Sequence, residues 1–284
     1  MLKSRVIKLC FNCLQVGQWR REMRTFVHVE ALIQMSNPYF RFKQFTIRHD
    51  RCAMRVGTDG VLLGAWVSPP SGGVTGEDTP WRVLDVGTGT GLIALMLAQR
   101  FPSACVTAVE IDPEAAGQAS ENVARSPFAD RVKMVCQDFL TWSSLEGYDL
   151  IVSNPPFFTE TLRSPDALRG LARHVGGLDF EGLLTHSVAL MRPQARLAVI
   201  LPATAQGLWT DLASREGLQV CRRTEVYTRS QKPCRRVLLE MQRADRGPTI
   251  NASPCPEDRL FISDSAGRFS PEYVALTRDF YLNF

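Results

Sequence analysis

The sequence lacks several features that mark common protein classes. No apolar run approaches the ~20 residues that a membrane-spanning helix requires. No Gly-x-Ser-x-Gly turn is present, so a serine hydrolase has no support. Cys10 and Cys13 are spaced like metal ligands, but no second Cys or His pair follows at a zinc-site distance. We therefore predict neither a membrane segment nor a bound metal.

The sequence also has only a small net charge. The 33 Lys and Arg residues against 29 Asp and Glu residues give a formal charge of +4, which permits a nucleic-acid partner without requiring one. The eight cysteines are scattered, and several, such as Cys105, lie in apolar runs where a small buried thiol is expected. This usage is typical of a reducing cytoplasm, so we predict a cytoplasmic protein, and we expect a monomer.

The chain is long enough for one sizeable core. Its 284 residues are 45% hydrophobic, which predicts one main domain of about 200 to 250 residues. We place this domain at residues 35–284. Residues 1–34 resemble a weak signal peptide, but polar Asn12 and Gln15 interrupt the apolar stretch and no small-residue cleavage site follows. We interpret them as an extension, disordered or translated from a misassigned start ahead of Met35.

From Trp81 onward, β-branched runs alternate with helical patterns, which is typical of a parallel sheet covered on both faces. The predicted strands are Arg82 to Val86, Cys105 to Ile111, Val132 to Gln137, Asp149 to Ser153 and Arg196 to Leu201. The predicted helices are Gly91 to Arg100, Pro113 to Arg125, Phe180 to Met191 and Ala205 to Glu216. Two later stretches, Leu218 to Thr228 and Arg236 to Gln242, flank a polar turn. The expected fold is α/β, with a doubly wound, mostly parallel, seven-stranded, Rossmann-like sheet and an antiparallel edge hairpin.

A glycine-rich turn follows the first predicted strand. Asp85 stands near the strand end, and Gly87, Gly89 and Gly91 lead into a helix. In a doubly wound sheet ligands bind at such a point, where glycines allow close approach and the helix offers free N–H groups. A plain tight turn is the alternative. A nicotinamide dinucleotide fits poorly, because Leu92 stands where the fingerprint needs its third glycine.

Acidic residues follow the next two predicted strands. The Glu110 carboxylate can accept hydrogen bonds from both ribose hydroxyls of a nucleoside cofactor. Asp138 could accept from an adenine amino group, with Phe139 packing nearby. An ordinary helix cap explains Asp138 equally well.

The fourth strand ends in the most informative segment, Asn154-Pro155-Pro156-Phe157. The two prolines fix φ and remove N–H donors, so the Pro155 carbonyl is held beside the Asn154 amide. These two acceptors can take both hydrogens of an aromatic amine and aim its nitrogen lone pair at a methyl donor. Phe157 can stack on a base that is flipped out or unpaired. The alternative is a Pro-Pro turn with Phe157 and Phe158 in the core.

Together, Asp-Val-Gly-Thr-Gly-Thr-Gly at residues 85–91 and Asn-Pro-Pro-Phe at 154–157 resemble the class I, N6-adenine or small-domain methyltransferases. Residues 42–66 and 269–282 closely resemble bacterial tRNA1(Val) adenine-37 N6-methyltransferases. The resemblance implies S-adenosylmethionine as cofactor and adenine N6 of a valine tRNA as target. It implies that Asn154 to Phe157 hold the amine and that the cofactor contacts Thr58, Asp59, Asp85, Gly87, Gly89, Gly91, Glu110, Asp138 and Phe139. Asp59 is also interpretable as a turn residue.

Other targets remain compatible with the motif. A guanine N2 of ribosomal RNA, a DNA adenine and a protein glutamine all present a planar nitrogen with two hydrogens. A non-catalytic module that binds cofactor or RNA is a further alternative, which the intact Asn154, Pro155 and Phe157 disfavour.

Three basic groups are candidate RNA contacts. For the first, packing on the core is the alternative, and for the third, a merely solvated charge cluster. His174 and His186 receive no catalytic role, because an aromatic amine needs no general base. The leading group is Arg41, Lys43, Arg48, His49, Arg51 and Arg55, interleaved with Phe40, Phe42 and Phe45. The others are Arg163, Arg169, Arg173 and His174 after the catalytic motif, and Lys232, Arg235 and Arg236 on the predicted hairpin turn.

Overall fold

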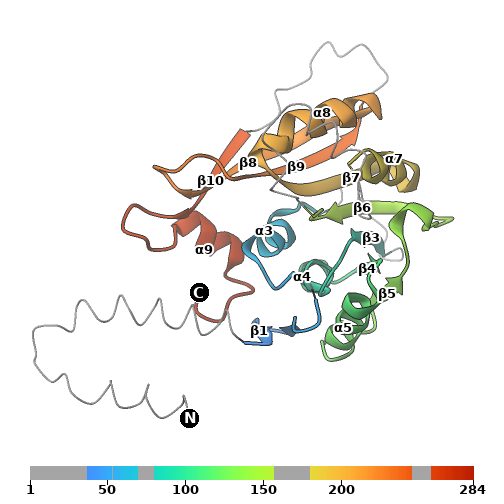
Figure 1. Ribbon diagram of the computed structural model, residues 1–284, viewed down its shortest axis with the longest axis horizontal. Coiled ribbons are helices and arrows are strands. Elements are labelled where there is room, and N and C mark those ends of the chain that lie inside the picture. Colours follow the sequence, from blue (N-terminus) through green and yellow to red (C-terminus); the bar gives the residue numbers. More distant parts are fainter. Residues whose placement is uncertain (1–36, 53, 70–79, 157–179, 245–256) are drawn as a thin grey trace, which may run out of the picture.

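A computed structural model describes residues 37–52, 54–69, 80–156, 180–244 and 257–284 (Figure 1). The predicted extension at residues 1–34 lies outside these ranges. Phe157, Phe158, Arg163, Arg169, Arg173 and His174 also lie outside them, so the roles predicted for these side chains are untested.

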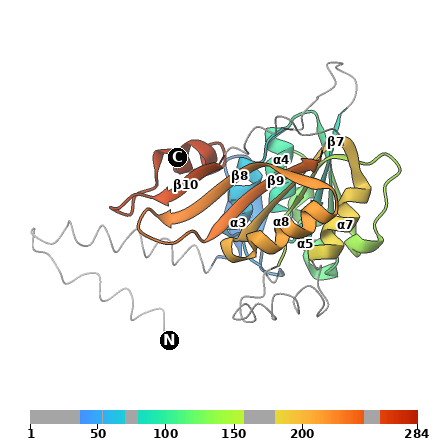
Figure 2. The same cartoon turned by 90° about the horizontal axis from the view of Figure 1, so that it is seen from above.

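Within these ranges the main sheet has eight strands, in the order β10-β8-β9-β7-β6-β3-β4-β5. Strands β3 to β7 are parallel, and β9 runs antiparallel to both β7 and β8. Figures 1 and 2 show β8, β9 and β10 extending the sheet to one side. The strands are β3 (Trp81–Val86), β4 (Ala104–Glu110), β5 (Val132–Cys136), β6 (Tyr148–Ser153), β7 (Met191–Pro202), β8 (Leu218–Arg229), β9 (Arg236–Arg243) and β10 (Glu257–Ser263).

The α/β fold with an antiparallel hairpin is confirmed, but the sheet has an eighth strand that the sequence did not reveal. β10 pairs in parallel with β8 at the sheet edge. Its first three residues, Glu257, Asp258 and Arg259, are charged and exposed, as is usual for an edge strand. Because of these charged residues, the sequence lacks the apolar alternation by which a strand is recognised.

Helices cover both faces of the sheet and form two separate cores (Figure 1). Val83 and Leu84 are adjacent on β3, so they point to opposite faces, and each belongs to a different core. One face carries α3 (Thr58–Trp66), α4 (Leu92–Arg100) and α5 (Pro113–Ala124). The other carries α7 (Phe180–Leu190), α8 (Gln206–Arg215) and the short 3₁₀ turn η1 (Phe139–Thr141). A second short turn, η2 (Ala203–Ala205), directly precedes α8.

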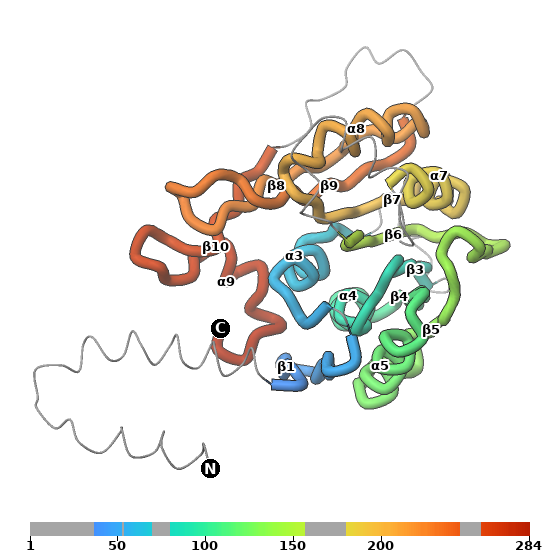
Figure 3. Tube along the Cα trace, viewed as in Figure 1, coloured from blue at the N-terminus to red at the C-terminus, as the bar shows by residue number. Residues whose placement is uncertain are grey.

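An aromatic hairpin lies against the C-terminal segment of the chain. Strands β1 (Tyr39–Arg41) and β2 (Thr46–Arg48) form this hairpin, and α9 (Pro271–Thr277) precedes the last residues. The tube in Figure 3 shows both segments at the same side of the molecule. Lys43 Nζ donates to the carbonyls of Arg278 at 2.5 Å and Phe284 at 3.0 Å. The hairpin is therefore held by residues more than 200 positions away.

The aromatic rings of this hairpin belong to the core. Phe42 and Phe45 are buried, and Phe42 stacks on Tyr281 with ring centroids 6.0 Å apart. RNA contact was therefore wrong for these two rings, and the core alternative holds.

The burial predicted for Cys105 is wrong in the opposite sense, because Cys105 is exposed in a groove that Lys133 and Trp142 also line.

No helix within the described ranges is long and apolar enough to cross a membrane.

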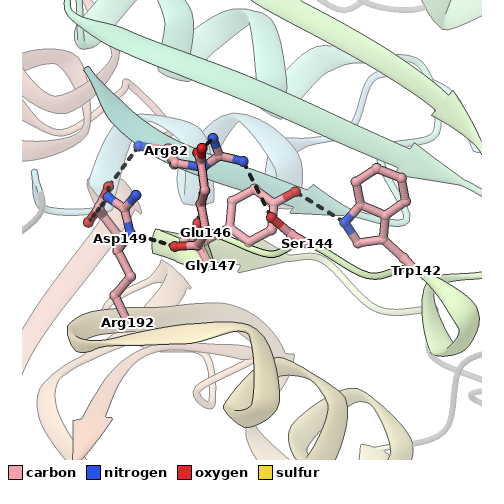
Figure 4. A network of polar contacts seen from close by, with 8 residues as sticks. Arg82, Trp142, Ser144, Glu146, Gly147, Asp149 and Arg192 are labelled. Atoms are coloured by element: carbon pink, nitrogen blue, oxygen red, sulfur yellow. Dashed lines mark hydrogen bonds and ion pairs between the residues drawn. The ribbon is translucent and has the colours of Figure 1, made fainter. Parts of the chain in front are cut away.

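A polar network fixes the first residues of β6 between β3 and β7 (Figure 4). The Asp149 carboxylate accepts from the Arg82 backbone N–H at 2.8 Å and from Arg192 Nη1 at 2.8 and 2.9 Å. Arg82 also donates to the Gly147 carbonyl at 3.1 Å and pairs with Glu146. Asp149 therefore joins three neighbouring strands at the edge opposite their carboxyl ends.

We expect Asp149→Ala to lower the free energy of unfolding by about 2 kcal/mol, because it leaves partly buried donors of Arg82 and Arg192 without an acceptor. Urea denaturation measures this loss. Glu146→Ala is the matched control, since its exposed ion pair contributes about 0.5 kcal/mol or less. Equal midpoints for the two variants would contradict the structural role of Asp149.

Candidate functional site

Two loops leave the sheet side by side at the carboxyl ends of β3 and β6. Val86 pairs with Ser153, and Ser153 Oγ donates to the Val86 carbonyl at 3.0 Å. The glycine turn begins one residue after Val86, and Asn154 directly follows Ser153. Because adjacent strands lie about 4.8 Å apart, the two motifs predicted from the sequence meet at one edge. Asn154 is half-buried, Pro155 is buried and Pro156 is exposed.

The glycine turn adopts a backbone that side chains disfavour. Gly87, Gly89 and Gly91 have φ angles of 65°, 57° and 80°. The N–H groups of Gly87 and Thr88 donate to the Val109 carbonyl at 2.9 and 3.1 Å, which ties the turn to β4. A β-carbon at Gly87 or Gly89 would meet no atom within 4 Å, whereas one at Gly91 would contact Ala119. The first two glycines thus face open space that a ligand can fill.

Asp85 lies beneath this turn and determines its shape. Its Oδ2 accepts from Thr88 Oγ1 at 2.5 Å and from the Ala94 N–H at 3.0 Å. The side chain is fully buried, and its Oδ1 has no partner among the described residues. Burial raises the pKa of Asp85 to about 7, and the nearby Glu110 charge adds to the rise. The hydrogen bonds from Thr88 and Ala94 oppose it.

Glu110 stands at the end of β4 with its carboxylate aimed at the turn. Oε2 accepts from the Gly89 N–H at 2.8 Å, and Oε1 accepts from the Asp112 N–H at 3.0 Å. Only 8% of the residue is exposed. Each oxygen keeps a second lone pair, so the fixed carboxylate can still accept from a diol.

Asp138 and Phe139 follow β5, as predicted, but their observed contacts are structural. Asp138 Oδ1 caps η1 by accepting from the Leu140 N–H at 2.9 Å, as in the helix-cap alternative. Phe139 is buried edge-on against His186, with ring centroids 4.8 Å apart. His186 Nε2 lies 2.7 Å from the Trp142 carbonyl oxygen, so it too has a structural role.

Thr58 and Asp59 begin α3. Thr58 is exposed, and Asp59 Oδ2 accepts from Arg236 Nε at 2.7 Å. Arg236 was predicted as an RNA contact or a solvated charge on the hairpin turn. It is the first residue of β9, as predicted, and half-buried. Its guanidinium pairs with Asp59, so the solvated-charge alternative does not hold.

Two buried amides on α5 connect the glycine turn to the leading segment. Asn122 Nδ2 donates to the Thr90 carbonyl and to the Arg48 carbonyl, both at 2.9 Å, while its Oδ1 accepts from the Arg48 N–H at 2.9 Å. Gln118 accepts from the Arg51 N–H at 3.1 Å. Sequence reasoning missed both residues. The available signal was two amides at helical spacing on the face that carries Ala119.

The leading basic segment is only partly available for RNA. His49 was a candidate contact, but it is buried with Nε2 at 2.9 Å from the Asn37 carbonyl oxygen, so that prediction is wrong. Arg51 pairs with Glu121 at 2.6 Å. Arg41 and Arg48 are exposed and line a groove of about 380 Å³ with Lys43 and Arg125. Among the described residues, no group of three or more His, Cys, Asp or Glu side chains could hold a metal ion.

Comparison with known proteins gives consistent matches. A family model described as "Methyltransferase small domain" matches residues 76–176. A Bacteroides fragilis protein named tRNA1(Val) (adenine(37)-N6)-methyltransferase is 47% identical over 251 residues, covering 87% of this chain and 99% of that protein. A Porphyromonas gingivalis protein of the same name is 48% identical, covering 87% of this chain and 96% of that protein. A solved structure of a predicted O-methyltransferase from Agrobacterium tumefaciens has a TM-score of 0.57 at 19% identity, covering 78% and 96% of the two chains.

We expect stability to fall as pH rises from about 4 to 7. The folded protein keeps the Asp85 proton up to about pH 7, whereas the unfolded chain loses it near pH 3.9. Between these values the folded state binds more protons, so rising pH favours unfolding. Urea denaturation at pH 5 and pH 7 should show wild type losing roughly 1 kcal/mol per pH unit relative to Asp85→Asn. Identical pH slopes would refute a raised Asp85 pKa.

Proposed function

This chain belongs to the bacterial tRNA1(Val) (adenine(37)-N6)-methyltransferase family, and on that premise we propose that it methylates N6 of adenine 37 in a valine tRNA with S-adenosylmethionine. The observation that carries the proposal is the pairing of Val86 with Ser153. It brings the open glycine turn and the Asn154-Pro155 acceptors to neighbouring strand ends. We assign the protein to the cytoplasm and expect it to act as a monomer. Sedimentation of the purified protein tests the oligomeric state.

The residues around the glycine turn fit a nucleoside cofactor. Gly87 and Gly89 leave the space that a side chain would occupy, and the Glu110 carboxylate is held at its rim. Glu110 can accept hydrogen bonds from two ribose hydroxyls. Thr58 and Asp59, which begin α3, are assigned to the methionine end, and Asp138 with Phe139 to the adenine. S-adenosylmethionine, when bound, supplies an electrophilic methyl group on a positively charged sulfur.

The main contribution proposed for the protein is to position the adenine amine. Asn154 Oδ1 and the Pro155 carbonyl can accept the two hydrogens of an adenine amine, which leaves its lone pair directed at the methyl group. Pro156 keeps this segment rigid, because its ring fixes φ. No strong base is required, since the N–C bond would form as the methyl–sulfur bond breaks and the sulfonium charge is neutralised, and the amine would release its proton to water as or after this happens. Phe157 is assigned to stack on the flipped base.

Replacing Asn154 by Ala should separate binding from chemistry. We expect kcat to fall roughly 100-fold, because the amine loses one of its two orienting acceptors. Cofactor affinity, measured by calorimetry, should stay within about twofold, because the residue does not contact the cofactor in this assignment.

Glu110→Gln is the comparison variant. It should weaken cofactor binding, while kcat at saturating cofactor stays near that of wild type. If Asn154→Ala loses cofactor binding and transfer to the same extent, the assigned role is incorrect.

The substrate is tested by mass spectrometry of nucleosides from individually purified tRNAs of a strain with and without the gene. Loss of N6-methyladenosine from one valine tRNA alone is the expected result. Unchanged tRNA together with a loss from ribosomal RNA, DNA or a protein amide would overturn the tRNA assignment.

A further inference from the structure

We propose that the turn joining β8 to β9 is a docking surface for the phosphate backbone of the RNA substrate. This basic turn comprises Arg229 and residues 230–235. The inference rests on the proposed function, because it names where the RNA meets the protein outside the amine-binding pocket.

The strand directions place the basic turn at the catalytic edge of the sheet. β7 runs parallel to β6, and its last residue, Pro202, pairs with Arg236 at the start of β9. β8 runs antiparallel to β9 and continues three residues beyond the pair of Val226 with Arg236. The turn therefore projects past the same strand ends that carry Asn154. Figures 1 and 2 show it beside the turn between β10 and α9 at one side of the molecule.

The turn is near enough to the site to act on the same substrate. β9 lies two strands from β6, about 10 Å at the usual strand spacing. The ion pair of Arg236 with Asp59, 2.7 Å long, joins the first residue of β9 to the first turn of α3. This contact makes the basic turn continuous with the segment assigned to the cofactor.

The charge of the turn is available for a partner. Arg229, Lys232 and Arg235 are exposed, and none of them forms an ion pair with another described residue. The adjacent arginines are already paired, Arg236 with Asp59 and Arg268 with Asp264. Three unneutralised cations on one projecting turn favour a polyanion, and phosphate groups accept hydrogen bonds from both guanidinium and ammonium groups.

The groove lined by Arg41, Arg48 and Arg125 is the competing basic surface. It lies at the far end of α5, which starts after the carboxyl end of β4 and runs back along the sheet. Twelve helical residues place its end about 18 Å from its start. Lys43, also in this groove, already donates to the Arg278 and Phe284 carbonyls. These facts favour the basic turn as the surface next to the reacting nucleotide.

The test compares two double variants that each remove one lysine and one arginine charge. Lys232→Gln/Arg235→Gln changes the basic turn. Lys133→Gln/Arg215→Gln changes exposed cations near the start of β5 and at the end of α8, away from the carboxyl ends of the strands. For the turn variant we expect KM for tRNA to rise about tenfold. The slope of log KM against the logarithm of the salt concentration should decrease by about 2. kcat and KM for the cofactor should stay within about twofold, and the thermal midpoint should match that of the control.

Two outcomes would overturn the proposal. One is a turn variant whose KM for tRNA and salt slope match those of the control. The other is a rise in KM confined to Arg48→Gln/Arg125→Gln, which would place the RNA in the groove beside α5. Failure of the proposed function is a separate result, because wild type would then transfer no methyl group to tRNA under conditions where it binds the cofactor.

Discussion

The parallel pairing of β3 with β6 is the constraint on which the site depends. These two strands are distant in sequence, and β4, α5 and β5 lie between them in the chain. Their register sets Val86 opposite Ser153, so the loops that follow must emerge together. The network around Asp149 fixes the other end of the same pair. A register shift would separate the glycine turn from Asn154 and would also turn the side chains of β6 to the wrong face.

Buried polar groups extend this constraint to the loops. Asp85 holds the glycine turn from below, and Asn122 holds it from the side while also binding the backbone of Arg48. Both side chains are almost completely buried, so their hydrogen bonds are formed in a medium where an unpaired donor or acceptor is costly. The buried residues behind the site therefore fix the shape of its loops and position its exposed groups.

The sequence predicted the parts of the fold that have strong periodicity. The alternation of strands and helices from Trp81 onward identified β3 to β7 and the helices between them, with ends within a few residues, although β7 begins five residues earlier than predicted. It did not reveal β1, β2 or α9, which are short and contribute to one shared core with distant residues. It also missed β10, whose charged residues obscure its pattern. Long, regular segments have a periodicity that can be recognised in the sequence, whereas short segments are stabilised by contacts with residues distant in the chain.

The site was predicted from motifs, and its supporting contacts were not. Gly87, Gly89, Glu110 and Asn154 stand at strand ends, where the order of elements alone places them. The pairing of Arg236 with Asp59 and the double contact of Asn122 join residues far apart in the chain, and no local pattern encodes such pairs. His49 shows the same limit, since its charged neighbours suggested a surface position although its ring is buried.

The contact of Lys43 with the segment after α9 has a consequence for the order of folding. Lys43 and Arg278 are separated by 235 residues, so this contact closes one of the longest loops in the chain. The ring of Phe42, in the β1–β2 hairpin, packs on Tyr281, so its packing is complete only after that distant residue has been synthesised. Since contacts of large sequence separation form slowly, the hairpin and the residues next to it should be among the last parts to become ordered. The hairpin thus precedes the sheet in the chain, but its packing is complete only when the segment after α9 is present.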